Sequence, residues 1–139
     1  MRVLLADDHE VVREGLRSLL ESQADIEVVG YAEDGASAVQ EAHRLNPDLV
    51  IMDITMPGMN GIDATREVVA GCPRTRVLCL SVHRNIPCVR AVFDAGASGY
   101  VLKDCAGREL IAAARSVAEG SMYVSPNISN AALDSYYAD

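Results

Sequence analysis

The sequence lacks the features of a nucleic-acid-binding or membrane-spanning chain. Tryptophan is absent, aromatic residues make up only 4 % of the 139 positions, and Lys103 is the single lysine. The net charge of −8 repels DNA phosphates and anionic membranes, so we expect the chain alone to bind neither DNA nor a membrane. No apolar run approaches the length of a membrane span, and no secretory signal opens the sequence, which together favour a cytoplasmic location.

The four cysteines also lack the spacing of a structural framework. No two of them form a C-x-x-C pair, and no pair of histidines has the spacing of metal ligands, which argues against a zinc site. Half of the residues are hydrophobic, enough to fill a core of Val, Leu, Ile and Ala without disulfides. We therefore expect free thiols, with Cys79 buried as a small hydrophobic side chain.

Short apolar runs alternate with segments of helical periodicity along most of the chain. The strands are predicted at residues 3–6, 27–31, 49–52, 77–80 and 99–102, and the helices at 10–21, 35–45, 61–71, 87–95 and 107–119. Strict alternation implies right-handed crossovers and an α/β fold, a doubly wound, flavodoxin-like parallel sheet of five strands in the order 2-1-3-4-5 with five helices. Residues 1–120 are expected to form one domain, and residues 121–139 a linker or a short extra helix.

Five polar residues follow or end the predicted strands: Asp7, Asp8, Asp53, Ser81 and Lys103. The carboxyl ends of parallel strands meet at one edge of a sheet, so we expect these side chains to lie close together. Three crowded carboxylates repel one another, and a hard divalent cation such as Mg²⁺ removes that conflict. An ammonium and a hydroxyl at the same edge complete a binding shell for a phosphoryl group.

Other phosphate-binding folds are a poor match. A dinucleotide or flavin site needs small residues and free backbone N–H groups after the first strand, where this chain has two acids. Neither G-x-G-x-x-G nor G-x-x-x-x-G-K-[ST] occurs in the sequence. The predicted site is therefore built from side chains, not from a glycine-rich loop.

Four motifs in this order carry a family resemblance. They are Val-Leu-Leu-Ala-Asp-Asp-His at 3–9, Asp-Ile-Thr-Met-Pro-Gly-Met-Asn-Gly at 53–61, Leu-Ser-Val-His at 80–83 and Gly-Ala-Ser-Gly-Tyr-Val-Leu-Lys-Asp at 96–104. Together they resemble the response-regulator receiver domain of bacterial two-component systems over roughly residues 1–120. The residues in these motifs are most similar to those of the NarL/FixJ (LuxR-type) subfamily.

The resemblance implies a phosphorylation site and a Mg²⁺ site. Asp53 would be the nucleophile that accepts a phosphoryl group from a sensor histidine kinase. Asp8 and Asp53 would coordinate Mg²⁺ through their carboxylates and Thr55 through its backbone carbonyl, with Asp7 helping through water. The chain would then be a phosphoacceptor rather than an enzyme, catalysing at most its own phosphorylation from small donors and its own dephosphorylation.

The resemblance also implies a switch. Lys103 and Ser81 would contact phosphoryl oxygens, and Tyr100 would turn inward as Ser81 moves. Thr55 and His83, two residues beyond Asp53 and Ser81, would tune the lifetime of the phosphorylated state. The alternative for Ser81, the less favoured one, is a simple strand-end residue. Tyr100 is equally a core aromatic, and His83 is equally an exposed loop residue. His9 and His43 are interpreted as solvent-facing residues on helices.

Partners follow from the subfamily. There the receiver precedes a helix-turn-helix output domain that controls transcription, so residues 121–139 are expected to lead to such a domain, absent from this chain, and DNA would be bound only through it. Phosphorylation is expected to favour self-association through helix 10–21 or helix 107–119. A stand-alone receiver acting through protein contacts is the alternative.

Two other functions share part of the pattern. A hydrolase of the haloacid-dehalogenase kind also uses an Asp nucleophile with Mg²⁺, but needs a second Asp two residues later, where this chain has Thr55. A pseudo-receiver would bind partners without accepting phosphate, and the complete set of polar strand-end residues argues against it.

Overall fold

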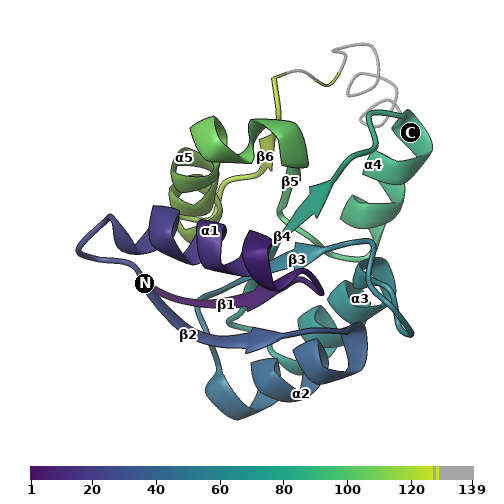
Figure 1. Cartoon of the computed structure of the whole chain (residues 1–139). Helices are drawn as coiled ribbons and strands as arrows, with labels where there is room; N and C mark the ends of the chain where they lie inside the picture. Colours follow the sequence, from purple (N-terminus) through teal and green to yellow (C-terminus); the bar gives the residue numbers. More distant parts are fainter. Residues whose placement is uncertain (127, 129–139) are drawn as a thin grey trace.

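The protein is a single twisted parallel sheet covered by helices on both faces, as the computed structural model shows for residues 1–126 and 128 (Figure 1). Within those residues the strand order is β2-β1-β3-β4-β5-β6, and every neighbouring pair is parallel. The strands are β1 (Arg2–Ala6), β2 (Glu27–Ala32), β3 (Leu49–Asp53), β4 (Arg76–Ser81), β5 (Gly99–Leu102) and β6 (Tyr123–Val124).

The predicted order of the first five strands is confirmed, and the predicted count of five is wrong. Two residues in the stretch interpreted as a linker form β6, which extends the sheet beyond β5 through the pairs Gly99 with Tyr123 and Tyr100 with Val124. A two-residue strand has no periodicity of its own and is defined by the edge it joins. The extra helix considered after Pro126 lies outside the described residues.

Five helices and one short 3₁₀ turn connect the strands. They are α1 (Glu10–Glu21), α2 (Gly35–Leu45), α3 (Gly61–Gly71), α4 (Ile86–Asp94), the turn η1 (Lys103–Cys105) and α5 (Ala106–Ala118). Helices α1 and α5 pack on one face of the sheet and α2, α3 and α4 on the other (Figure 1). Strand β3 contributes to both cores because its alternate residues, Leu49 and Val50, point to opposite faces and are fully buried.

Local sequence signals fix where several helices begin and end. The Asn60 side chain accepts hydrogen bonds from two N–H groups of the first turn of α3, the usual role of an N-cap side chain. Pro87 lies in the first turn of α4, where its missing N–H costs no helical hydrogen bond. Gly96 follows α4 with a φ of +104°, a backbone conformation that side chains with a Cβ rarely adopt.

The segment after α5 is bound tightly to β5. Ser125 is 1 % exposed, and its hydroxyl accepts a hydrogen bond from the Leu102 N–H at 2.9 Å and donates one to Glu109 of α5 at 2.8 Å. Its own N–H donates to the Tyr100 carbonyl at 2.9 Å, and Ile128 is buried in the core beside these strands. Tyr123 and Val124 therefore continue the sheet, and Ser125 fixes the chain beyond them to β5 and α5.

The four cysteines are thiols outside any disulfide, and Cys79 is fully buried as expected. Burial raises the pKa of its thiol to about 12. Across the part of the chain that the structure describes, no helix combines the length and apolar character needed to cross a bilayer.

Candidate functional site

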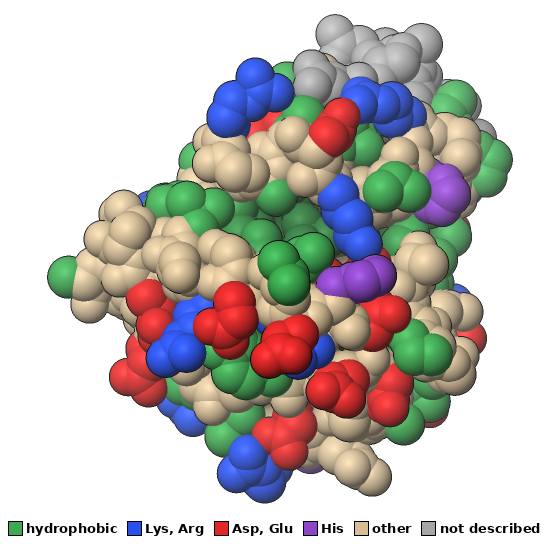
Figure 2. Space-filling view, viewed as in Figure 1, with side chains coloured by type: hydrophobic (Ala, Val, Ile, Leu, Met, Phe, Trp, Pro, Cys, Tyr) green, Lys and Arg blue, Asp and Glu red, His purple; other side chains and the backbone are tan. Residues whose placement is uncertain are grey.

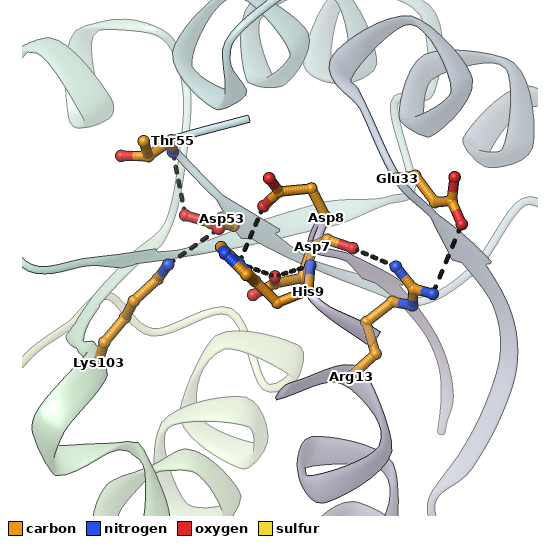
Figure 3. Close-up of polar contacts among 8 residues, drawn as sticks. All are labelled: Asp7, Asp8, His9, Arg13, Glu33, Asp53, Thr55 and Lys103. Atoms are coloured by element: carbon orange, nitrogen blue, oxygen red, sulfur yellow. Dashed lines mark hydrogen bonds and ion pairs between the residues drawn. The ribbon is translucent and has the colours of Figure 1, made fainter. Parts of the chain in front are cut away.

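The polar residues predicted at the strand ends lie at the carboxyl edge of the sheet, and Figure 3 shows four of them: Asp7, Asp8, Asp53 and Lys103. Asp7 and Asp8 follow β1, Asp53 is the last residue of β3, Ser81 is the last residue of β4, and Lys103 follows β5. Carboxylate oxygens of the three acids and one ring nitrogen of His9 lie within 4.8 Å of one another. The arrangement concentrates negative charge at one point and provides one ammonium beside it.

Asp53 is the centre of this arrangement. Its side chain is completely buried, its Oδ1 accepts a hydrogen bond from the Thr55 N–H at 3.0 Å, and its Oδ2 accepts one from Lys103 Nζ at 2.9 Å. Burial raises the pKa of Asp53, an effect that outweighs the opposing influence of Lys103 and of the Thr55 N–H, and the nearby Asp7 charge raises it further. The ionised carboxylate is thus incompletely compensated.

Asp7 contains an unsatisfied atom next to Asp53. The residue is 1 % exposed, and its Oδ1 accepts a hydrogen bond from the His9 backbone N–H at 2.8 Å. Its Oδ2 has no hydrogen-bond partner among the described residues. A buried carboxylate oxygen without a partner is costly, and a cation or its bound water would satisfy it. Asp8 is more accessible, with 29 % of its side chain exposed. The carboxylates of the three acids provide only oxygen ligands, which a hard divalent cation prefers.

Arg13, which the sequence did not identify as a site residue, supports the acidic loop. Its Nη1 donates a hydrogen bond to the Asp7 carbonyl at 2.7 Å, and its Nη2 lies 3.6 Å from a carboxylate oxygen of Glu33 (Figure 3). The guanidinium packs over the Tyr31 ring, 5.8 Å from its centroid, and the side chain is 11 % exposed. The position of Arg13 in the first turn of α1, five residues after Asp8, was the available signal.

Ser81 and Tyr100 hold the same loop from two sides. The Ser81 hydroxyl accepts a hydrogen bond from the His83 N–H at 2.9 Å, and the Tyr100 hydroxyl donates one to the His83 carbonyl at 2.7 Å. Tyr100 is fully buried, which raises the pKa of its hydroxyl, and also donates to Cys88 Sγ at 3.4 Å. The loop between β4 and α4 is therefore attached to both residues.

Thr55 and His83 lie at the surface beside this site, whereas His43 lies in the last turn of α2, next to the end of α3. Thr55, His83 and His43 are exposed, the last on α2 as expected. His9 corrects the expectation of a purely solvent-facing residue: its side chain is 64 % exposed, but its Nδ1 lies 3.1 Å from Asp8 Oδ1 and 3.3 Å from Asp7 Oδ1. Exposure was predicted correctly, and the contact with the acids was missed because His9 immediately follows the strand end.

Known proteins with a similar sequence identify the family of this chain. Residues 3–115 match the family described as "Response regulator receiver domain". The response regulator UvrY of Escherichia coli (strain K12) is 41 % identical over 128 residues, which cover 92 % of this chain and 59 % of UvrY. The transcriptional regulatory protein DegU of Brevibacillus brevis is 38 % identical over 136 residues, covering 98 % of this chain and 58 % of DegU. The chain thus spans about three fifths of the length of these curated relatives.

Solved structures give the same result. A LuxR-family two-component response regulator from Aurantimonas sp. SI85-9A1 superposes with a TM-score of 0.91 at 36 % identity, covering 98 % of this chain and 97 % of that one. The isolated REC domain of RcsB from Salmonella enterica serovar Typhimurium, solved in the presence of the phosphomimetic BeF₃⁻, superposes with a TM-score of 0.84 at 29 % identity, covering 92 % and 95 %. The chain belongs to the receiver-domain family of two-component response regulators, and its relatives place it in the LuxR-type (NarL/FixJ) subfamily.

Proposed function

We propose that Asp53 accepts a phosphoryl group from a sensor histidine kinase and that Mg²⁺ assists the transfer. The observation that carries the proposal is the buried Asp53 carboxylate, 2.9 Å from Lys103 Nζ and beside two further acids. In the transfer, an Asp53 oxygen attacks the phosphorus of a phosphohistidine. The new O–P bond forms as the P–N bond breaks, and the electron pair of that bond returns to the histidine nitrogen.

The acids would hold the cation. Asp8 and Asp53 would bind Mg²⁺ through carboxylate oxygens, Thr55 through its carbonyl, and Asp7 through water. The unpartnered Asp7 Oδ2 supports this assignment because it is a buried acceptor in need of a donor or a cation. Bound Mg²⁺ would offset negative charge on the phosphoryl oxygens.

The neighbouring residues would then respond to the new anion. Lys103 would transfer its contact from Asp53 Oδ2 to a phosphoryl oxygen. Ser81 accepts from the His83 N–H and has only a long contact with Cys88 Sγ, at 4.0 Å, so its O–H would turn to donate to another phosphoryl oxygen. A movement of Ser81 toward the phosphoryl group would pull on the loop that Tyr100 also holds, which changes the surface offered to partners. Thr55 and His83, both exposed beside the site, would tune attack by water.

The rival functions fit the site less well. A haloacid-dehalogenase-type hydrolase needs an acid two residues after its nucleophile, and Thr55 offers only a hydroxyl. A pseudo-receiver would not need the ion pair between Asp53 and Lys103. We therefore propose that the chain is a phosphoacceptor. It would catalyse its own phosphorylation from small phosphodonors and its own dephosphorylation by water, and it would not turn over an external substrate.

The relatives suggest the wider role. DegU is named a transcriptional regulatory protein, so we propose that the whole protein regulates transcription in the cytoplasm through a DNA-binding helix-turn-helix domain. Residues 1–120 would be its receiver, and residues 121–139 would lead to that domain. The visible face of this chain mixes acidic and basic side chains without a continuous basic patch, which favours DNA binding through another domain (Figure 2). Phosphorylation would strengthen self-association through α1 or α5; a stand-alone receiver is the second candidate.

The decisive experiment is mass spectrometry after incubation with acetyl phosphate and Mg²⁺. A phosphoryl adduct that is present in the parent and in Asp63→Asn, but absent in Asp53→Asn, supports the proposal; Asp63 is a surface acid on the following helix. Continuous turnover of a phosphomonoester would instead support the hydrolase. No adduct on any of the three proteins would support the pseudo-receiver.

A further inference from the structure

We propose that His9 is a nitrogen ligand of the acidic site, so that the site binds late transition-metal cations such as Ni²⁺ and Co²⁺ as well as Mg²⁺. The inference rests on the cation site of the proposed function and adds a ligand to it. The added ligand would determine which cations compete with Mg²⁺ for the cation site beside Asp53.

The separations between the donor atoms fit one shared cation. His9 Nδ1 lies 3.1 Å from Asp8 Oδ1 and 3.3 Å from Asp7 Oδ1, and donor atoms of these residues and of Asp53 all lie within 4.8 Å of one another. Ligand atoms that each lie ~2.1 Å from a common metal are about 3 Å apart when they are adjacent in an octahedron. The imidazole nitrogen therefore occupies the position of a neighbouring ligand.

A second feature points to a bound cation. Asp7 is 1 % exposed, and its Oδ2 lacks a hydrogen-bond partner among the described residues. The acid could have been satisfied by the ring of His9, but that ring approaches Oδ1, which the His9 backbone N–H already contacts. One face of the cluster thus retains an unused, buried acceptor.

The backbone fixes His9 while its ring stays adjustable. The His9 N–H donates to Asp7 Oδ1 at 2.8 Å, and the His9 carbonyl accepts from the Arg13 N–H at 3.0 Å. With 64 % of the side chain exposed, the ring can turn toward a metal without repacking the core. Figure 3 shows the ring between the two acids of the β1 loop and Lys103.

The chemistry of the added ligand predicts selectivity. Mg²⁺ takes oxygen ligands and keeps several waters, so an imidazole adds little to its affinity. Ni²⁺ and Co²⁺ bind imidazole well and bind mixed nitrogen and oxygen sites more tightly than earlier divalent metals. His9 should therefore raise the affinity for Ni²⁺ relative to Mg²⁺ and make Ni²⁺ a competitor at the phosphoacceptor site.

The test is calorimetric titration of the whole chain with Ni²⁺ and, separately, with Mg²⁺. His9→Gln is compared with His43→Gln and His83→Gln, which remove the other two histidines of the chain one at a time. We expect His9→Gln to weaken Ni²⁺ binding about tenfold or more and to leave Mg²⁺ affinity within about twofold, with no change in the other two variants. Any Ni²⁺ binding at the thiols or the N-terminal amine is the same in the parent and in all variants, so it does not affect the comparison of their affinities.

Visible absorption of bound Co²⁺ provides the spectroscopic check, because loss of a nitrogen ligand alters the band of the metal. Equal Ni²⁺ affinities and equal Co²⁺ spectra for His9→Gln and the parent would overturn the inference. A loss confined to His83→Gln would overturn it as well. Failure of the parent to bind Mg²⁺ would count against the proposed function, whereas the role of His9 is decided by the Ni²⁺ affinities and the Co²⁺ spectra.

Discussion

Asp53→Asn should make the protein more stable while abolishing phosphoryl acceptance. The substitution preserves shape and keeps an Oδ1 that can accept from the Thr55 N–H at 3.0 Å, but removes the buried charge. The loss is the charge-assisted hydrogen bond from Lys103, worth about 1.5–3 kcal/mol. The gain is relief from burying an ionised carboxylate, which costs several kcal/mol, together with relief from repulsion by Asp7.

The direction of the Asp53 pKa decides which effect is larger. Burial raises that pKa in spite of Lys103, so the ionised carboxylate is less favourable in the folded protein than in the unfolded chain. We therefore expect Asp53→Asn to raise the free energy of unfolding by about 1 kcal/mol at neutral pH, and the melting temperature by about 4 °C. Lys103 loses a partner, but 26 % of its side chain is exposed, so water can solvate the ammonium.

The effect should depend on pH. Between the ordinary Asp value of 3.8 and the raised pKa of the folded protein, the folded state holds the extra proton, so stability falls as pH rises through that window. The advantage of Asp53→Asn is therefore largest at neutral pH and shrinks as pH drops toward 3.8. Urea unfolding followed by circular dichroism, with a chelator present, measures the difference in stability between Asp53→Asn and the parent at neutral pH and near pH 3.8.

The surface variant Asp63→Asn is the matched control and should change stability by about 0.5 kcal/mol or less. Its carboxylate is 56 % exposed, forms a surface ion pair with Arg66 and accepts a long hydrogen bond from Asn60 Nδ2 at 3.4 Å. A parent that is equally stable or more stable than Asp53→Asn at neutral pH would refute the conclusion that burial outweighs the Lys103 contact.

Three further predictions concern the metal and the lifetime. Mg²⁺ should raise the melting temperature of the parent by mass action, and Asp8→Ala should lose most of that gain in a thermal-shift titration; coincident parent curves would exclude a metal site. Arg13→Ala should weaken Mg²⁺ binding several-fold by releasing the Asp7 carbonyl, and Arg13→Lys less so; equal affinities in calorimetry would refute a positioning role. His83→Ala should change the phosphoryl half-life several-fold without changing acceptance, and identical decay rates would contradict this.

Hydrophobic patterning was sufficient to predict most of the fold. The predicted strand 49–52 is observed as Leu49–Asp53, and the predicted helix 107–119 as Ala106–Ala118. Such segments are long and strongly patterned, so local sequence and tertiary packing favour the same structure. The pair Tyr123 and Val124 escaped prediction because its strand exists only through hydrogen bonds to β5, a non-local partner.

The topology of the sheet made the location of the site predictable. The list of predicted site residues was incomplete because it also depends on the local geometry of the loops. Parallel strands end at one edge, so the residues after them had to converge, and Asp53 and Lys103, fifty positions apart, lie 2.9 Å from each other. Which side chains complete the cluster depends on how the chain turns after each strand. The chain turns between the end of β1 and the start of α1, and this turn places His9 beside the acids and Arg13 beside the Asp7 carbonyl. Hydrophobic periodicity does not predict the geometry of this turn.

Strand β5 connects the proposed phosphoryl site with the segment that follows α5. It carries Tyr100, whose hydroxyl holds the His83 loop, and it ends at Leu102, directly before Lys103. The backbone N–H of Leu102 donates to the buried hydroxyl of Ser125, and the Tyr100 carbonyl accepts from the Ser125 N–H. A displacement of Lys103 toward a phosphoryl group would therefore act on a strand that is hydrogen-bonded to the chain beyond α5. If residues 121–139 lead to an output domain, as proposed above, the strand that ends beside Asp53 is joined by hydrogen bonds to the segment that leads to that domain.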